Sequence, residues 1–154
     1  MQVSRSEEYG VRLVLSLAAS GGQLAIRELA AREGLPEPTV AKVVSRLRRA
    51  GLVEAARGRR GGYTLARPAE RLSLGSVVEA MTGSLSERRL CARMTPSGGV
   101  CAHARGCGLR PVWRDLEAVI GSFLDRITVA DVVGRRTVEA PALAARPLAG
   151  PAGS

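Results

Sequence analysis

The sequence predicts a mainly α-helical fold with one small two-stranded β-wing. Apolar residues recur at the 3/4/7 spacing of amphipathic helices along most of the chain. The exception is a pair of short, partly β-prone runs, residues 52–56 and 63–66, joined by a stretch rich in glycine and arginine. Because glycine permits the positive φ angles of a tight hairpin tip, these two runs are predicted to pair as a hairpin.

The first predicted helix covers residues 4–19. Ser4 is a suitable N-cap, and Glu7 follows three residues later, which is the spacing of a capping box. A second, short helix is predicted at 26–33, where apolar residues recur on one side. Gly34 follows its end, as expected of a C-terminal cap.

The third predicted helix covers residues 38–50. Pro38 suits its first turn, where a backbone N–H has no partner in any case, and Gly51 follows its end. Four apolar residues form a single stripe at helical spacing: Val40, Val43, Val44 and Leu47. The opposite face carries hydroxyl and basic side chains: Thr39, Lys42, Ser45, Arg46 and Arg49.

Basic charge is concentrated in this helix and the wing. Residues 42–71 contain nine Lys or Arg against two Glu, which accounts for +7 of the chain's formal charge of +9. The basic helix face alone is also compatible with an ordinary solvated surface. The wing tip favours nucleic-acid binding, because it adds a further group of positive charges: Arg57, Arg59 and Arg60.

Two short helices joined by a tight turn and followed by a hairpin predict a winged helix-turn-helix. We expect the basic helix face to contact bases and phosphates of double-stranded DNA in the major groove. Arg59 and Arg60 are expected to reach the minor groove.

The second half of the chain begins with a small predicted helix at 73–81. A long helix with a wide apolar stripe is predicted at 109–127. It either packs within the monomer or forms a dimer; we favour a dimerisation helix, because a protein that reads two-fold DNA sites is itself two-fold. The predicted organisation is a DNA-binding domain at 1–83, a cysteine-containing loop at 84–108, a dimerisation helix at 109–134 and a disordered tail at 135–154.

The loop carries all three cysteines of the chain, Cys91, Cys101 and Cys107, among glycine and basic residues. Structural cysteines usually lie singly on apolar faces, so three in one loop indicate thiolate metal ligands. One reading is an iron–sulfur cluster with a fourth ligand that is not cysteine. The other is a Cys3His zinc site that includes His103, the only histidine.

Composition excludes several other classes of protein. The N-terminus lacks the pattern of a signal peptide, and the longest apolar run is too short to span a bilayer, so a cytoplasmic protein without a membrane partner is expected. No cysteine with a paired base, no carboxylate pair and no phosphate-binding loop is recognisable, so we expect no enzyme activity.

In combination, these features resemble the Rrf-type family of bacterial winged-helix iron–sulfur regulators, typified by IscR and NsrR. The resemblance extends from residue 1 to about residue 133. It rests on the three cysteines ahead of a long helix and on the following segments: 8–12, 42–44, 50–53, 57–63, 65–68 and 124–131.

The resemblance implies a homodimeric transcriptional regulator, expected to be a repressor, that binds palindromic promoter DNA. It further implies that the three cysteines hold a 4Fe-4S or 2Fe-2S cluster, and that this cluster senses nitric oxide, redox stress or iron–sulfur status. Glu8 occupies the place of a carboxylate ligand supplied by the other subunit in NsrR-like members. Arg110 stands where IscR-like members have a histidine ligand. The alternative is a cluster-free or zinc-containing winged-helix regulator that responds to a small molecule or a protein partner.

Overall fold

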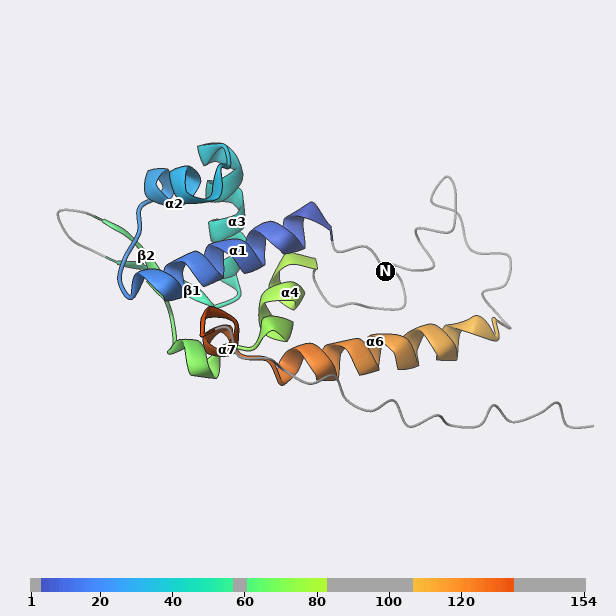
Figure 1. The fold of residues 1–154 in the computed structure, drawn as a ribbon. Coiled ribbons are helices and arrows are strands. Elements are labelled where there is room, and N and C mark those ends of the chain that lie inside the picture. The colour runs from blue at the N-terminus through green and yellow to red at the C-terminus, as the bar shows by residue number, and fades with distance from the viewer. Residues whose placement is uncertain (1–3, 57–60, 83–106, 135–154) are drawn as a thin grey trace, which may run out of the picture.

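The structure of the chain is a computed structural model that describes residues 4–56, 61–82 and 107–134. The helices and strands occur in the following order (Figure 1): α1 (Arg5–Ser20), α2 (Ile26–Glu33), α3 (Glu37–Arg49), β1 (Val53–Ala56), β2 (Gly62–Leu65), the 3-10 helix η1 (Ala69–Arg71), α4 (Leu74–Thr82), α6 (Leu109–Asp125) and α7 (Val129–Val133). The predicted fold class, mainly helical with a two-stranded wing, is confirmed.

The capping signals of the first two helices are present as predicted. The Glu7 N–H donates to Ser4 Oγ at 3.3 Å, and the Ser4 N–H donates to a Glu7 carboxylate oxygen at 2.6 Å. This reciprocal pair satisfies two backbone donors that have no partner within the helix. Gly34 follows α2 with φ 63°, the left-handed conformation that favours glycine.

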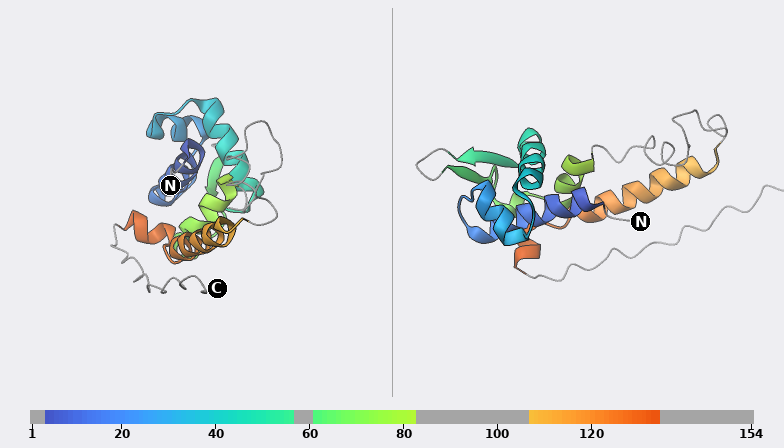
Figure 2. Two further views of the ribbon diagram at one scale, coloured as in Figure 1. Left: turned by 90° about the vertical axis from the view of Figure 1, so that its right-hand side faces the viewer. Right: turned by 90° about the horizontal axis from the view of Figure 1, so that it is seen from above.

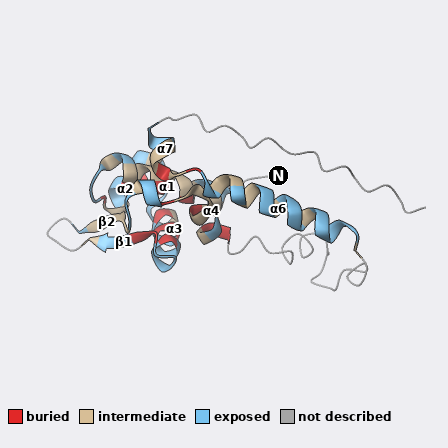
Figure 3. Ribbon diagram, turned by 90° about the horizontal axis from the view of Figure 1, so that it is seen from below, coloured by how far each residue is buried: buried red, intermediate tan, exposed pale blue. Residues whose placement is uncertain are grey.

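Helix α3 lies against the core through the predicted apolar stripe. Val40, Val43, Val44 and Leu47 are all buried, and they belong to one core with apolar residues of α1, α2 and α4. Figure 3 marks in red the buried residues along α1, α3 and α4. The burial pattern confirms that one side of α3 is held by packing while its other side is free.

The wing is an antiparallel hairpin whose pairs include Val53 with Leu65 and Ala56 with Gly62. It is attached to the helical domain by an isolated bridge, in which Leu24 and Tyr63 exchange backbone hydrogen bonds of 2.8 and 3.0 Å. A Cβ at Gly62 would lie 2.8 Å from the Leu24 carbonyl oxygen, so only glycine permits this approach. The bridge fixes the base of the wing relative to α1 and α2.

The long helix ends earlier than predicted, and the chain then returns to the DNA-binding domain. Helix α6 ends at Asp125 rather than at residue 127, and a further helix, α7, was not predicted. Thr128 begins α7 with its own capping box. Backbone hydrogen bonds of 2.8 Å join Leu74 to Ile127 and Val129 to Leu72, and Val129 is fully buried. The predicted dimerisation segment 109–134 therefore contains two parts, of which the second belongs to the core.

Helix α6 extends away from the rest of the fold. Its C-terminal half packs against α4, whereas its N-terminal half projects beyond the helical domain (Figure 1 and the right-hand view of Figure 2). No residue of α6 is buried. Among the described residues, no helix is long and apolar enough to cross a membrane.

Helices α1 and α4 approach closely at Gly10. A Cβ at this position would lie 2.3 Å from Met81 Cγ and 3.0 Å from Met81 Sδ, and both residues are buried. The missing side chain of Gly10 therefore provides the space that Met81 fills. This contact brings the end of α4 onto the first half of α1.

We expect Gly10→Ala to destabilise the fold by about 1 to 2 kcal/mol. Overpacking costs roughly 1–3 kcal/mol, the flexible methionine relieves part of the clash, and alanine returns about 1 kcal/mol of helix propensity. Gly121→Ala in α6 is the matched control, because its Cβ would meet no atom within 4 Å. The control should gain about 1 kcal/mol. Urea unfolding monitored by circular dichroism measures both, and a stabilised Gly10→Ala variant would contradict the close contact.

Candidate nucleic-acid interface and cysteine site

The exposed side of α3 presents polar and basic side chains. Lys42, Ser45 and Arg49 are exposed, and Thr39 is half-buried. The Arg49 Nε–H donates to the Ser45 carbonyl oxygen at 3.4 Å, which directs this guanidinium along the helix surface. Because the opposite side of the helix is buried, this face can enter a DNA groove without disturbing the core.

The wing follows α3 directly, and β1 packs against that helix. The three predicted DNA-contacting arginines of the wing tip, Arg57, Arg59 and Arg60, lie outside the described residues. What the structure places is the base of the wing, which lies beside the helix that carries the basic face.

Arg46 differs from the other predicted DNA-contacting residues of α3. Its Nη1 donates to the Met81 carbonyl oxygen at 3.3 Å and to Ser6 Oγ at 3.4 Å. Met81 lies in the last turn of α4, and Ser6 lies in the first turn of α1. The guanidinium therefore contacts two other helices of the same chain.

Of the three cysteines, the structure describes Cys107 alone. Its side chain is half-buried, it forms no disulfide, and it lies two residues before Leu109, the first residue of α6. The Arg110 N–H donates to the Cys107 carbonyl oxygen at 3.3 Å, which joins Cys107 to the first turn of that helix. The other predicted ligands Cys91, Cys101 and His103 lie outside the described residues. The described His, Cys, Asp and Glu residues contain no group of three placed to hold a metal ion.

Glu8, the predicted carboxylate ligand, is exposed near the beginning of α1. The beginning of α1 and the beginning of α6 lie apart in the views of Figures 1 and 2. Since Glu8 belongs to the beginning of α1 and Cys107 lies just before α6, a ligand set that contains both would take the carboxylate from a second chain.

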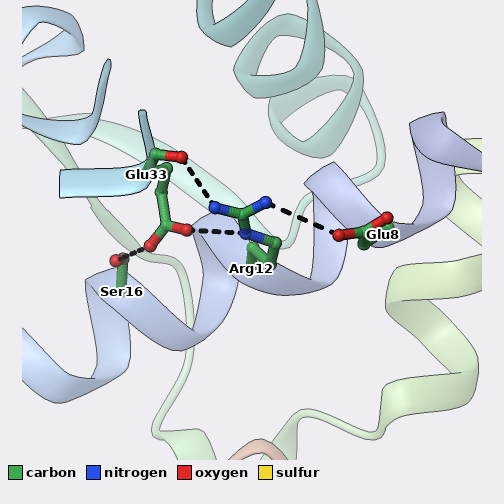
Figure 4. Close-up of polar contacts among 4 residues, drawn as sticks. All are labelled: Glu8, Arg12, Ser16 and Glu33. Carbon is green, nitrogen blue, oxygen red and sulfur yellow. Dashed lines mark hydrogen bonds and ion pairs between the residues drawn. The ribbon is translucent and has the colours of Figure 1, made fainter. Parts of the chain in front are cut away.

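Arg12 lies between Glu8 and Glu33 (Figure 4). Its Nε–H donates to a Glu33 carboxylate oxygen at 2.8 Å, and its Nη2 donates to the Glu33 carbonyl oxygen at 2.6 Å. A third contact, from Nη1 to a Glu8 carboxylate oxygen, is longer at 3.5 Å. Ser16 Oγ donates to the other carboxylate oxygen of Glu33. The contacts of these four residues join the middle of α1 to the C-terminal end of α2.

The Glu33 carboxylate accepts a hydrogen bond from Arg12 and thereby raises the pKa of Arg12 above its usual value. Because the pKa of Arg12 is higher in the folded than in the unfolded protein, its contact stabilises the fold fully at any pH below the unfolded pKa. This stabilisation is lost only as the pH rises through the folded pKa. Arg12 therefore stays charged over the whole physiological range. The ion pair with Glu33 therefore always has its cation.

Helix α6 carries an exposed apolar face. Leu109, Val112, Leu116 and Val119 recur at 3/4 spacing, and their exposed fractions are 59%, 56%, 44% and 40%. Exposed large apolar residues in such a row indicate a surface that another protein covers. The sequence predicted this stripe, and residues 4–56, 61–82 and 107–134 leave it exposed.

Sequence reasoning missed two contacts. Arg12–Glu33 and Arg46–Met81 join residues 21 and 35 positions apart. No periodicity relates such residues, since each contact depends on how the helices pack. A signal was available for Glu33, which continues the i, i+3, i+4, i+7 spacing of Ile26, Leu29 and Ala30 and so places a carboxylate on the inward face of α2.

Comparison with known proteins places the chain among transcriptional regulators. The family model described as Rrf2, iron-dependent transcriptional regulator, matches residues 3–135. An HTH-type transcriptional regulator of Mycobacterium tuberculosis is 36% identical over 136 residues, covering 87% of this chain and 82% of the relative. The HTH-type transcriptional regulator IscR of Yersinia pestis is 30% identical over 140 residues, covering 90% and 82%. The structure of CymR, the global cysteine regulator of B. subtilis, superposes with a TM-score of 0.68 at 23% identity, covering 89% of this chain and 99% of CymR, and shows the shared fold.

The contacts of Arg12 predict unequal energetic coupling to its two carboxylates. A double-mutant cycle with Arg12→Gln and Glu33→Gln should give a clearly larger coupling energy than the cycle with Arg12→Gln and Glu8→Gln. The reason is that the Arg12 Nε–H donates to the largely buried Glu33 carboxylate at 2.8 Å, whereas the contact with Glu8 is 3.5 Å long and exposed. The hydrogen bond from Arg12 to the Glu33 backbone carbonyl oxygen survives Glu33→Gln and does not enter the cycle. Urea unfolding of the variants measures both couplings, and equal values would contradict the geometry.

Proposed function

We infer that, since the chain belongs to the Rrf2 family of transcriptional regulators, its three cysteines hold an iron–sulfur cluster that controls its affinity for promoter DNA. The family consists of DNA-binding regulators and not of enzymes. The observation that carries the proposal is the combination of an exposed basic face on α3 with a cysteine that lies at the start of an exposed apolar helix. The first feature suits DNA, and the second suits a ligand shared between two chains.

DNA contact is proposed for the exposed side of α3, through Thr39, Lys42, Ser45 and Arg49. Their hydroxyl, ammonium and guanidinium groups bind phosphate oxygens and base edges in the major groove. Arg46 belongs to the same predicted set, although its guanidinium is engaged within the chain. The wing-tip residues Arg57, Arg59 and Arg60 complete the proposed surface at the minor groove.

The proposed cluster is a 4Fe-4S or 2Fe-2S group held by Cys91, Cys101 and Cys107, with Glu8 of a second subunit as fourth ligand. When bound, it supplies a link that nitric oxide, oxidants or iron shortage can break. Arg12 holds the Glu8 carboxylate from the side of α1 and is itself fixed by Glu33. We propose that loss of the link alters α1, and through it the two helices of the DNA-binding motif, and that the chain acts as a repressor.

A homodimer is proposed through α6. Most of the row of exposed apolar residues lies on the N-terminal half of α6, which projects from the DNA-binding domain. Burying such a row between two copies removes apolar surface from water and fixes the separation of the two α3 helices. A two-fold protein then reads a two-fold DNA site.

A second candidate function is a regulator without an iron–sulfur cluster, in which zinc takes Cys91, Cys101, Cys107 and His103, or a small molecule or protein partner provides the signal. A groove of about 320 Å³ between α4 and α6 supports the small-molecule form. Its lining combines apolar residues with three carboxylates and one guanidinium: Glu79, Glu117, Asp125 and Arg114.

Metal analysis separates the two candidates. Protein purified under strict anaerobiosis should be brown and contain iron and acid-labile sulfide, because thiolates are the preferred ligands of iron–sulfur clusters. Cys107→Ala and Cys101→Ala should both lose iron and sulfide, whereas Cys107→Ser should retain part of the cluster. A colourless wild-type protein that contains zinc, or no metal, would contradict the cluster and favour the second candidate.

Substitution in the apolar face of α6 should dissociate the dimer. Leu116→Glu places a charge in a surface that must become dry, so sedimentation equilibrium should give the monomer mass of 16.2 kDa instead of twice that value. Ser122→Glu, an exposed position outside the apolar row, is the matched control and should remain dimeric. A dimeric Leu116→Glu variant would contradict the proposed interface.

A further inference from the structure

We propose that Arg46 is a positioning residue, which holds α3 against α1 and α4 and does not contact DNA. In this role it transmits the state of the cysteine site to the DNA-binding face of α3. The part concerning transmission rests on the proposed function; the part concerning position rests on the hydrogen bonds alone.

The first observation is the chemistry of the acceptor. The Met81 carbonyl belongs to the last turn of α4, where carbonyl groups have no N–H partner within the helix. These carbonyls also carry the negative end of the helix dipole. A guanidinium Nη1 at 3.3 Å satisfies the carbonyl and compensates this charge. The position suits a cation on intramolecular grounds, without any DNA.

The second observation is that three helices meet at this point. Arg46 also donates to Ser6 in the first turn of α1, so one guanidinium joins α3 to both other helices. The Met81 side chain fills the space left by Gly10 of α1. Helices α1, α3 and α4 pack against each other throughout the domain. We call the set Ser6, Arg46 and Met81 the Arg46 bridge.

The third observation is where the Arg46 bridge lies along the chain. Ser6 is two positions before Glu8, the proposed carboxylate ligand, and the chain continues from the end of α4 toward the cysteines. A change at Glu8 therefore acts on α1, and a change at the cysteines acts on the end of α4. Arg46 joins both of these helices to α3. Arg46 and the two other basic residues of this face, Lys42 and Arg49, are all exposed, and Lys42 lies one turn before Arg46.

The first test uses metal-free protein without DNA and compares Arg46→Met with Lys42→Met by hydrogen–deuterium exchange. Both substitutions remove one positive charge from α3 and keep an unbranched side chain. Arg46→Met should accelerate exchange in the last turn of α4 roughly fivefold, because a charge-assisted hydrogen bond to that turn is lost. Lys42→Met should leave this turn unchanged. Identical exchange in wild type and Arg46→Met would overturn the Arg46 bridge.

The second test measures DNA affinity of both variants over a series of salt concentrations, with protein purified anaerobically and after removal of its metal. Arg46→Met should keep the wild-type slope of log affinity against log salt. Its ratio of DNA affinities between the anaerobically purified and the metal-free protein should shrink toward one. Lys42→Met should reduce the magnitude of the slope by about 1, which corresponds to one phosphate contact, and keep the wild-type ratio. A lower slope with an unchanged ratio for Arg46→Met would overturn the proposal, because it assigns Arg46 to the DNA.

The two tests separate failure of the inference from failure of the proposed function. If wild-type protein shows the same affinity with and without its metal, the cluster-controlled function fails. The exchange experiment and the salt slope then still decide whether Arg46 binds the end of α4 or the DNA. A merely structural residue would change the exchange rate and leave the ratio between the two forms as it is in wild type.

Discussion

The position of α3 depends on one buried surface. Val40, Val43, Val44 and Leu47 insert into the core that α1, α2 and α4 provide, and none of the four is more than 5% exposed. Since this side of the helix is fixed by packing, its polar side has a defined direction. The position of the wing depends on the same core, because β1 packs on α3 and the Leu24–Tyr63 bridge joins β2 to the helical domain. A recognition surface requires this rigidity, because contacts to base edges depend on side chains held at fixed positions.

Local patterns predicted most of the fold. The Ser4–Glu7 capping box, the bounds of α2 and the buried stripe of α3 all follow from neighbouring residues, and the structure confirms each of them. Helix α7 escaped prediction because five residues give no readable period. Its first residue, Val129, is held by a backbone hydrogen bond to Leu72, and Ile127 just before it by one to Leu74, and both partners lie far away in the sequence. The same reason applies to the long-range contacts of Arg12 and Arg46.

The candidate site could be predicted only in part. Charge concentration and helical spacing identified the basic face of α3, because both are properties of the sequence itself. Arg46 was assigned to that face from the rotation of about 100° per residue along a helix alone. This rotation does not show that the end of α4 lies within reach of the guanidinium. Side-chain hydrogen bonds thus connect α1 to two other helices: Arg12 bonds to Glu33 of α2, and Ser6 accepts from Arg46 of α3. Helix α1 is therefore in contact with both helices of the DNA-binding motif and also carries the proposed ligand Glu8.

The central claim is that a group bound at the cysteines changes the affinity for DNA. The most direct measurement takes one preparation, divides it, removes the metal from one half under anaerobic conditions, and determines the dissociation constant of each half for duplexes selected from a random-sequence library with each form. The account predicts dissociation constants that differ by a factor of roughly 5 to 150, which is the usual range of coupling between two sites in a protein. Equal dissociation constants for both halves, with removal of the metal verified, would contradict it.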